Sequence, residues 1–331
     1  MKNAQLTLHS AACVRRSSAN PVLTADDLAY DSNLVFNAGV VRFGGGYRML
    51  FRNDYGYRNG QFAGTNLGVA ESTDGIRWTP HRAPMLRAED VADGEVRRVY
   101  DPRLTEIDGT VYICFAMDTA HGIRGGIGRI RGDFEGIDIL SLSVPDNRNM
   151  VLFPAKIGGM YVRLERPFPV YSRGRDRFDI WLSRSPDLKF WGESELVLGV
   201  EDVPFANDKI GPAAPPIRTE KGWLTLFHTV DRDNARGKNG WEPTWQKRYC
   251  AGVMLLDLDR PEQVIGLSRT PLIAPEAPYE TDGGFRNDVI FPGGLIAEPD
   301  GRVKIYYGAA DTVECLAEST IAELLALCAP V

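Results

Sequence analysis

The hydrophobic and polar positions of this chain repeat one pattern five times. Each copy is a run of apolar residues, a tight turn rich in Gly, Asp or Lys, and a second run with aromatic and β-branched residues, which is typical of a β-hairpin. The copies occupy residues 39–52, 103–116, 153–166, 215–228 and 293–308. Most are followed by a further strand and a polar turn, at 67–78, 178–191 and 251–261. The repeat unit is therefore predicted to be a sheet of three or four antiparallel strands.

The spacing of the repeats indicates the architecture. Successive copies lie very roughly 50 to 80 residues apart, a little longer than the commoner propeller repeats. Small antiparallel sheets closed radially protect their edges, so five repeats predict an all-β, five-bladed β-propeller. A two-domain sandwich would also be rich in strands, but no linker interrupts the chain, and we expect a single domain over residues 1–331. A short C-terminal helix is predicted in ESTIAELLALC, with Ser319 or Thr320 as its N-cap.

Composition narrows the class of protein. The 331 residues carry a formal net charge of −6, which argues against a nucleic-acid-binding surface. The N-terminus lacks a continuous apolar signal region, and no segment is apolar over the roughly 20 residues of a membrane span, so we expect a cytoplasmic protein without a membrane partner. The five cysteines are far apart and lack CxxC spacing, which predicts neither a disulfide framework nor a metal site. The sequence leaves open whether the protein forms a homo-oligomer.

Polar residues recur at equivalent places in the repeats. The residues just before the hairpins are Asn37, Asp101, Arg148 with Asn149, Lys209, and Asn287 with Asp288. The residues at the far ends of the hairpins are Arg52, Arg166, His228 and Asp311. The first strand of each propeller blade lines the central channel, so the positions before the hairpins should converge at one end of the axis, where ligands bind. Any one of these residues could be a solvated loop residue, but their agreement in phase predicts a binding site.

These phrases resemble glycoside hydrolase family 130, the β-mannoside phosphorylases and related mannosidases. The similarity runs from about Asn20 to Ala317 and rests on FNAGV, YDPRLT, DNRNMVLFP with RLERP, the KIG segment before PP, YCAGVMLLDL and YYGAAD. The phrases SNLVFNAG, FRNDYG and VPFANDKIGP look most like the branch that acts on β-1,2-mannobiose and 1,2-β-oligomannans. The resemblance implies an enzyme whose partners are a small mannoside and inorganic phosphate, the latter as co-substrate, with no cofactor.

The resemblance also implies a role for each residue. Asp101 corresponds to the catalytic acid, and the sequence does not decide whether its proton moves directly or through a sugar hydroxyl. The implied phosphate-binding residues are Arg148, Arg166 and Lys209, with His228 and Tyr249 beside them. The implied substrate-binding residues are Asn37, Arg52, Asp54, Tyr100, Asn149, Asp288 and Asp311.

An acid beside several cations suits phosphorolysis with inversion. Cleavage of a glycoside with inversion needs an acid for the leaving oxygen and a nucleophile on the opposite face. Water needs a carboxylate base, whereas phosphate is already anionic and needs cations that bind and orient it. The expected products are α-D-mannose 1-phosphate and a shortened mannoside. The alternatives are a β-1,4-mannoside phosphorylase, a β-mannosidase and a non-catalytic mannan-binding propeller.

Two tryptophans lie in the polar loop between the fourth hairpin and the strand that follows it. Trp241 and Trp245 could stack on an acceptor sugar or anchor their own loop, and the sequence favours the anchor.

Overall fold

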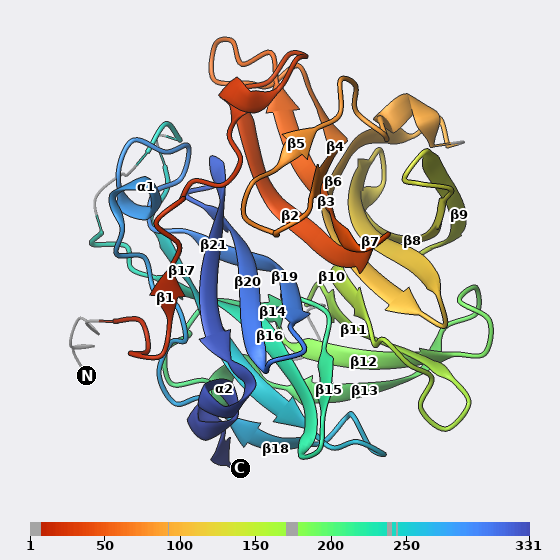
Figure 1. Cartoon of the computed structure of the whole chain (residues 1–331), viewed down its shortest axis with the longest axis vertical. Helices are drawn as coiled ribbons and strands as arrows, with labels where there is room; N and C mark the ends of the chain where they lie inside the picture. Colours follow the sequence, from red (N-terminus) through yellow and green to blue (C-terminus); the bar gives the residue numbers. More distant parts are fainter. Residues whose placement is uncertain (1–7, 92, 170–177, 237–239, 243) are drawn as a thin grey trace.

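Five antiparallel sheets surround a central axis in the computed structural model of the chain (Figure 1). The structure describes residues 8–91, 93–169, 178–236, 240–242 and 244–331. The sheets follow one another around the axis in chain order, and the fifth comes back beside the first. The predicted all-β, five-bladed propeller is confirmed.

Each sheet is one blade, and its strands are numbered outward from the axis in the first three blades. Blade 1 contains β2 (Leu34–Phe43), β3 (Gly46–Tyr55), β4 (Gly64–Ser72) and β5 (Thr79–Pro80). Blade 2 contains β6 (Val96–Ile107), β7 (Thr110–Thr119), β8 (Gly122–Arg131) and β9 (Gly136–Leu142). Blade 3 contains β10 (Asn147–Leu152), β11 (Tyr161–Pro167), β12 (Ile180–Ser185) and β13 (Gly192–Leu198).

The last two blades also recruit the ends of the chain. Blade 4 contains β14 (Lys209–Pro212), β15 (Ile217–Thr219), β16 (Gly222–Arg232), β17 (Lys247–Leu256), β18 (Val264–Leu267) and the C-terminal β22 (Ala329–Pro330). Blade 5 contains β19 (Ile290–Ala297), β20 (Arg302–Ala309), β21 (Val313–Thr320) and the N-terminal β1 (Arg15–Arg16). These two terminal strands cover outer sheet edges that would otherwise be open to pairing with another chain.

The helical segments are short. Among the described residues they are α1 (Pro278–Thr281), α2 (Ile321–Leu327), and the 3₁₀ turns η1 (Ala25–Asp27), η2 (Ala88–Asp90) and η4 (Val200–Asp202). Helix α2 is the predicted C-terminal helix. It begins after Thr320, whose hydroxyl accepts a hydrogen bond from the backbone N–H of Glu323 at 3.1 Å, so Thr320 is the N-cap. Leu324 is fully buried in the apolar cluster shared by blades 4 and 5.

The core is divided into apolar clusters between neighbouring blades. Inner strands pack on both faces, which explains why segments such as β16 are apolar with little alternation. The cluster between blades 4 and 5 contains 18 buried residues, whereas the cluster between blades 2 and 3 contains six. The interface between blades 2 and 3 is therefore less apolar, and polar side chains occupy its outer part.

Candidate active site

A β-bulge interrupts the first strand of blades 1, 2 and 3 at the same level. The register of β2, β6 and β10 with the next strand shifts at Asn37, Asp101 and Asn149. These residues have φ angles of 54°, 53° and 56°, in the left-handed region that Asn and Asp adopt more readily than other non-glycine residues. Because a bulge re-aims a side chain, each of the three blades turns one polar group out of its regular strand direction.

Asp101 is almost enclosed by protein. Its side chain is 9% exposed, Asn37 Nδ2 donates to its Oδ1 at 2.9 Å, and Arg52 Nη1 lies 3.4 Å from the same oxygen. Asp101 Oδ2 makes no hydrogen bond to any other described residue. One oxygen is therefore fixed by neighbours, while the other has no hydrogen-bond partner among the described residues.

Arg52 is held in place from behind by Asp54. Its Nε and Nη2 donate to the two oxygens of Asp54 at 2.9 and 2.7 Å, and Thr65 Oγ1 donates to Asp54 at 2.6 Å. Burial opposes ionisation of Asp54, but Arg52 and Arg98 hold its pKa below the usual value. Tyr100 contributes a ring 5.1 Å from the Arg52 guanidinium and donates its hydroxyl to Asp118 at 2.7 Å. Asp54 therefore positions Arg52, and its predicted contact with the sugar stays a prediction.

Arg148, Arg166 and Lys209 form a group that we call the cation cluster. Arg148 and Arg166 lie opposite each other in the β10–β11 pair, and Lys209 is the first residue of β14. Arg166 is 1% exposed, and its Nη1 lies 3.1 Å from His228 Nε2. Arg166 Nε and Nη2 and Arg148 Nε are buried without hydrogen-bond partners among the described residues. No carboxylate of the described residues forms an ion pair with the cation cluster.

Burial and mutual repulsion shift the pKa values of these groups. Burial and the neighbouring arginines lower the pKa of Lys209 to about 6. Burial and Arg148 lower the pKa of Arg166 to about 9. Burial among the cations also lowers the pKa of His228 well below its ordinary value. Because unpaired buried charge costs free energy, this arrangement is suited to binding an anion.

Aromatic rings enclose the cation cluster. The guanidinium carbon of Arg166 lies 5.9 and 5.1 Å from the ring centres of Phe168 and Phe178, and Lys209 Nζ lies 5.6 Å from that of Tyr249. Burial raises the pKa of Tyr249 to about 12, so its phenol stays a hydrogen-bond donor. These rings limit the access of water to the cluster, which strengthens electrostatic interactions there.

Asp311 and Asn149 also belong to the predicted site residues that the structure brings together. Asp311 is buried and accepts a hydrogen bond from Arg286 Nη1 at 3.1 Å, and burial raises its pKa despite that arginine. Asn149 Nδ2 lies 3.5 Å from His228 Nε2, which connects the sugar-binding and phosphate-binding sets of the sequence prediction.

The backbone of Asp288 lies beside β17. Its backbone oxygen accepts a hydrogen bond from Tyr249 N at 2.8 Å. Burial raises the pKa of the Cys250 thiol, and the Asp288 carboxylate raises it further. The predicted sugar contact of Asp288 stays a prediction.

The two loop tryptophans differ in exposure. Trp245 is 8% exposed, and its Nε1 donates to Asn287 O at 3.0 Å, so it anchors its loop. Trp241 is 42% exposed, and its ring lies 5.6 Å from that of Tyr57.

Arg103 was missed by the sequence prediction. It is 2% exposed, lies two residues after Asp101, and donates from Nη1 to Pro102 O at 2.9 Å and from Nε to Ala213 O. Asp101 and Glu314 favour its charge, but burial lowers its pKa. The signal in the sequence was a cationic residue at the start of a predicted hairpin, two residues after Asp101.

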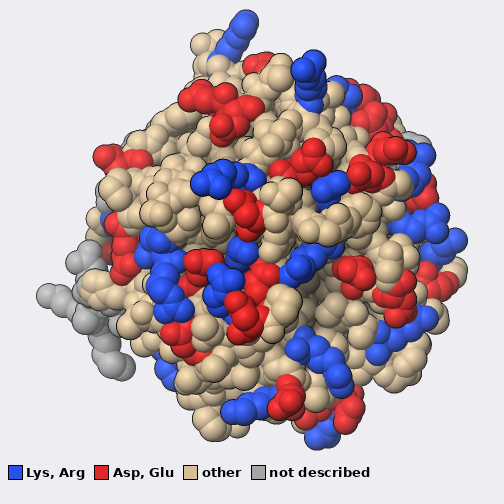
Figure 2. Space-filling model, viewed as in Figure 1, with Lys and Arg blue, Asp and Glu red and all other residues tan. Residues whose placement is uncertain are grey.

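Other kinds of site find little support in the described residues. No group of three His, Cys, Asp or Glu side chains is arranged there to hold a metal ion. None of the helices in that part of the chain has the length and apolar character to cross a membrane. Acidic and basic side chains are interspersed over the face in Figure 2, without an extended area of one sign.

The propeller and its site define a class of protein. An enclosed acid beside buried cations without carboxylate partners, at the inner ends of propeller blades, is suited to an enzyme that handles an anionic co-substrate. The sequence matches the family model for glycoside hydrolase family 130, described as β-1,4-mannooligosaccharide phosphorylase, over residues 16–330. The chain belongs to this family, and it is a glycoside phosphorylase.

Similar proteins match most of the chain. A β-1,4-mannooligosaccharide phosphorylase from Ruminococcus albus is 34% identical over 94% of this chain and 89% of its own. A β-1,2-mannobiose phosphorylase from Listeria innocua is 33% identical over 78% of this chain and 67% of its own. The solved structure of β-1,2-mannobiose phosphorylase from Listeria innocua, in complex with β-1,2-mannobiose, aligns with a TM-score of 0.80 and 25% identity over 95% of this chain and 98% of that one.

Proposed function

We propose that this protein catalyses the reversible, inverting phosphorolysis of β-1,2-linked mannobiose or short mannooligosaccharides. The products are α-D-mannose 1-phosphate and a mannoside shortened by one residue. The proposal that phosphate is the co-substrate rests on the cation cluster, whose buried guanidinium nitrogens lack partners and lie close to Asp101. The similarity to β-1,2-mannobiose phosphorylase in sequence and in structure supports the linkage.

In this proposal the cation cluster binds phosphate and orients it. Arg148 and Arg166 offer forked N–H donors that match phosphate oxygens, and Lys209 adds a point charge. The three buried nitrogens without partners are directed donors that an oxyanion would satisfy. Bound phosphate would also raise the pKa of Lys209 from about 6, because an opposite charge favours the ammonium form. Fixing phosphate beside the sugar replaces a bimolecular encounter by a nearly unimolecular step.

Asp101 is the proposed general acid. Its Oδ1 is held by Asn37 and approached by Arg52, which leaves Oδ2 to deliver a proton toward the leaving oxygen, directly or through a sugar hydroxyl. The departing mannosyl residue is proposed to contact Asn37, Arg52, Asn149 and Asp311. Tyr100, Asp54 and Asp288 complete the proposed substrate-binding set.

Hydrolysis by water fits the site less well. An inverting hydrolase needs a second carboxylate about 6.5–9.5 Å from the acid to activate water. The cations are proposed to occupy the nucleophile side of the site, and no carboxylate of the described residues forms an ion pair with them. This favours phosphate as the nucleophile.

A β-1,4-mannoside is the second candidate substrate. The description of the family model and the 34% identical relative from Ruminococcus albus favour it. Incubation with β-1,2-mannobiose and with β-1,4-mannobiose, each with and without phosphate, separates the candidates. We expect phosphate-dependent release of mannose from the 1,2-linked disaccharide and α-mannose 1-phosphate as the product by NMR. Equal rates without phosphate would refute the phosphorylase, and a preference for the 1,4-linked disaccharide would refute the linkage.

We further propose that residues 1–331 act as one catalytic domain that needs no cofactor. Dialysis against a chelator, followed by the phosphorolysis assay, tests the second point. Full activity is expected, and a loss that a divalent cation restores would contradict it.

A further inference from the structure

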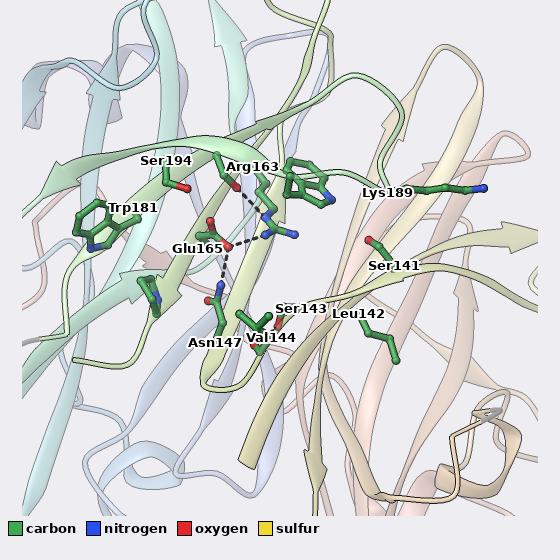
Figure 3. A pocket seen from close by; sticks show the side chains of 13 residues that line it. Ser141, Leu142, Ser143, Val144, Asn147, Arg163, Glu165, Trp181, Lys189 and Ser194 are labelled. Carbon is green, nitrogen blue, oxygen red and sulfur yellow. Dashed lines mark hydrogen bonds and ion pairs between the residues drawn. The ribbon is translucent and has the colours of Figure 1, made fainter. Parts of the chain in front are cut away.

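A groove lies between blades 2 and 3 (Figure 3). Residues of β11 alternate between the two faces of blade 3. Arg166 belongs to the cation cluster, whereas Arg163 and Glu165 line the groove. Its volume is about 370 Å³, within the range of small-molecule sites. The cluster of buried apolar residues between blades 2 and 3 is smaller than the clusters between the other blades. The groove therefore occupies space that apolar side chains fill at the other interfaces.

The floor of the groove is a fixed polar array. Arg163 Nη2 lies 2.8 Å from Glu165 Oε2, and Asn147 Nδ2 donates to the same oxygen at 2.7 Å, as the dashed lines in Figure 3 show. The Asn147 residue is 8% exposed, and both charged side chains are 7% exposed. Asn147 Oδ1 is buried without a hydrogen-bond partner among the described residues. The array therefore presents an acceptor that a hydroxyl group could satisfy.

Two indoles give the groove apolar surfaces. Trp191 lies under the guanidinium of Arg163, with 4.0 Å from the guanidinium carbon to the ring centre. Trp181 lies on the other side of Glu165, and both indoles are half-buried. Ser141 and Ser194 add hydroxyls that both donate and accept hydrogen bonds.

These features select a chemical class of ligand. An anion is weakly attracted, because Glu165 already neutralises Arg163 and the other lining cation, Lys189, is exposed to solvent. A wholly apolar molecule would leave the Asn147 acceptor unsatisfied. A neutral ligand with hydroxyl donors at its edges and C–H groups on its faces satisfies both the polar array and the indoles. Sugar rings have this chemistry.

We propose that the groove is a second carbohydrate-binding site that holds a neutral oligosaccharide segment apart from the catalytic centre. The choice of a mannoside as ligand rests on the proposed function, whereas the neutral polyhydroxyl class rests on the groove itself. Such a site would retain the enzyme on a longer chain while the catalytic centre acts on a chain end.

Saturation-transfer NMR with β-1,2-mannotriose in phosphate-free buffer tests this proposal. The measurements use the Arg52→Ala variant, in which binding at the catalytic centre is weakened. We expect the sugar signals to persist in this variant and the dissociation constant to rise about tenfold or more when Trp181→Ala is added, because the stacking surface is lost. Ser194→Trp, which fills the groove from its exposed rim without removing a packed side chain, should have the same effect.

Phe190→Ala is the matched control. Phe190 is 74% exposed on the β12–β13 turn and does not line the groove, so binding and phosphorolysis should be unchanged. Binding that survives both Trp181→Ala and Ser194→Trp would overturn the proposal, as would its complete loss in Arg52→Ala alone. Cellotriose in the same experiment separates a mannoside site from a general glycan site. Phosphorolysis is assayed separately, so failure of the proposed function would appear there and not in the NMR titration.

Discussion

Replacement of Arg166 by methionine should stabilise the fold while it removes the response to phosphate. Arg166 is 1% exposed, has two buried nitrogens without partners, and lies beside Arg148. Methionine has a similar length and adapts to irregular space, so the cavity left behind is small. The substitution therefore removes an uncompensated buried charge at little cost in packing.

The magnitude follows from the pKa of this side chain. Burial and Arg148 lower the pKa of Arg166 from 12.5 to about 9. At about 1.36 kcal/mol for each pKa unit, the cationic form is about 5 kcal/mol less stable there than in water. The substitution removes this cost, but part of the gain in stability is lost because His228 Nε2 loses its neighbour at 3.1 Å. We expect Arg166→Met to raise the free energy of unfolding by roughly 1–3 kcal/mol in phosphate-free buffer.

Denaturation with and without phosphate measures both effects. Phosphate at about 100 times its dissociation constant should stabilise the wild-type protein by about 2.7 kcal/mol. In Arg166→Met this stabilisation should be almost absent, and kcat/KM for phosphorolysis should fall by about 100-fold or more, as expected for a lost charge-assisted contact.

Arg163→Met is the matched control, because Arg163 lies in the same strand and is similarly buried. Its guanidinium is paired with Glu165 at 2.8 Å, so its removal leaves a buried carboxylate unpaired and should destabilise the fold by about 3–5 kcal/mol. The phosphate response of this variant should persist. If Arg166→Met were destabilised as much as Arg163→Met, or still gained stability from phosphate, Arg166 would not be an unpaired anion-binding group.

Three further predictions concern the acid, the lysine and the helix cap. Asp101→Asn keeps an acceptor for Asn37, so the fold and the phosphate-induced stabilisation should persist while kcat falls by about 10²–10⁴-fold; retained turnover would exclude Asp101 as the acid. Lys209 binds an anion in its protonated form, and its pKa of about 6 in the free protein rises on binding. The inhibition constant of sulfate, whose charge is constant in this range, should therefore rise up to about tenfold per pH unit above about pH 6, and a similar slope in Lys209→Met would contradict this. Thr320→Ala removes the α2 cap and should lower the free energy of unfolding by about 1 kcal/mol in chemical denaturation, with Thr320→Ser as the conservative control; equal loss in both would show that the cap hydroxyl is not responsible.

The sequence of β11 shows where local information ends. Its RLERP phrase contains Arg163 and Arg166, three residues apart. Strand alternation places Arg163 on the same face as Glu165 and Arg166 on the opposite face, but it does not show what that opposite face meets. In the fold one guanidinium is paired with Glu165, and the other lies in the cation cluster without a carboxylate. The burial of both arginines, and the absence of a carboxylate opposite Arg166, depend on residues from other strands and blades, which become neighbours only when the propeller closes.

The sequence by itself determined the hairpin repeat, the number of blades, the C-terminal helix and the phase that places Asp101 and Lys209 on the first strands of their blades. These features follow from alternation, turn chemistry and capping, which act over a few residues. Only the tertiary structure decided that bulges at Asn37, Asp101 and Asn149 re-aim their side chains and that a polar groove separates blades 2 and 3. A left-handed backbone angle and the filling of an interface both depend on what the neighbouring strands and blades require, and no stretch of sequence specifies that alone.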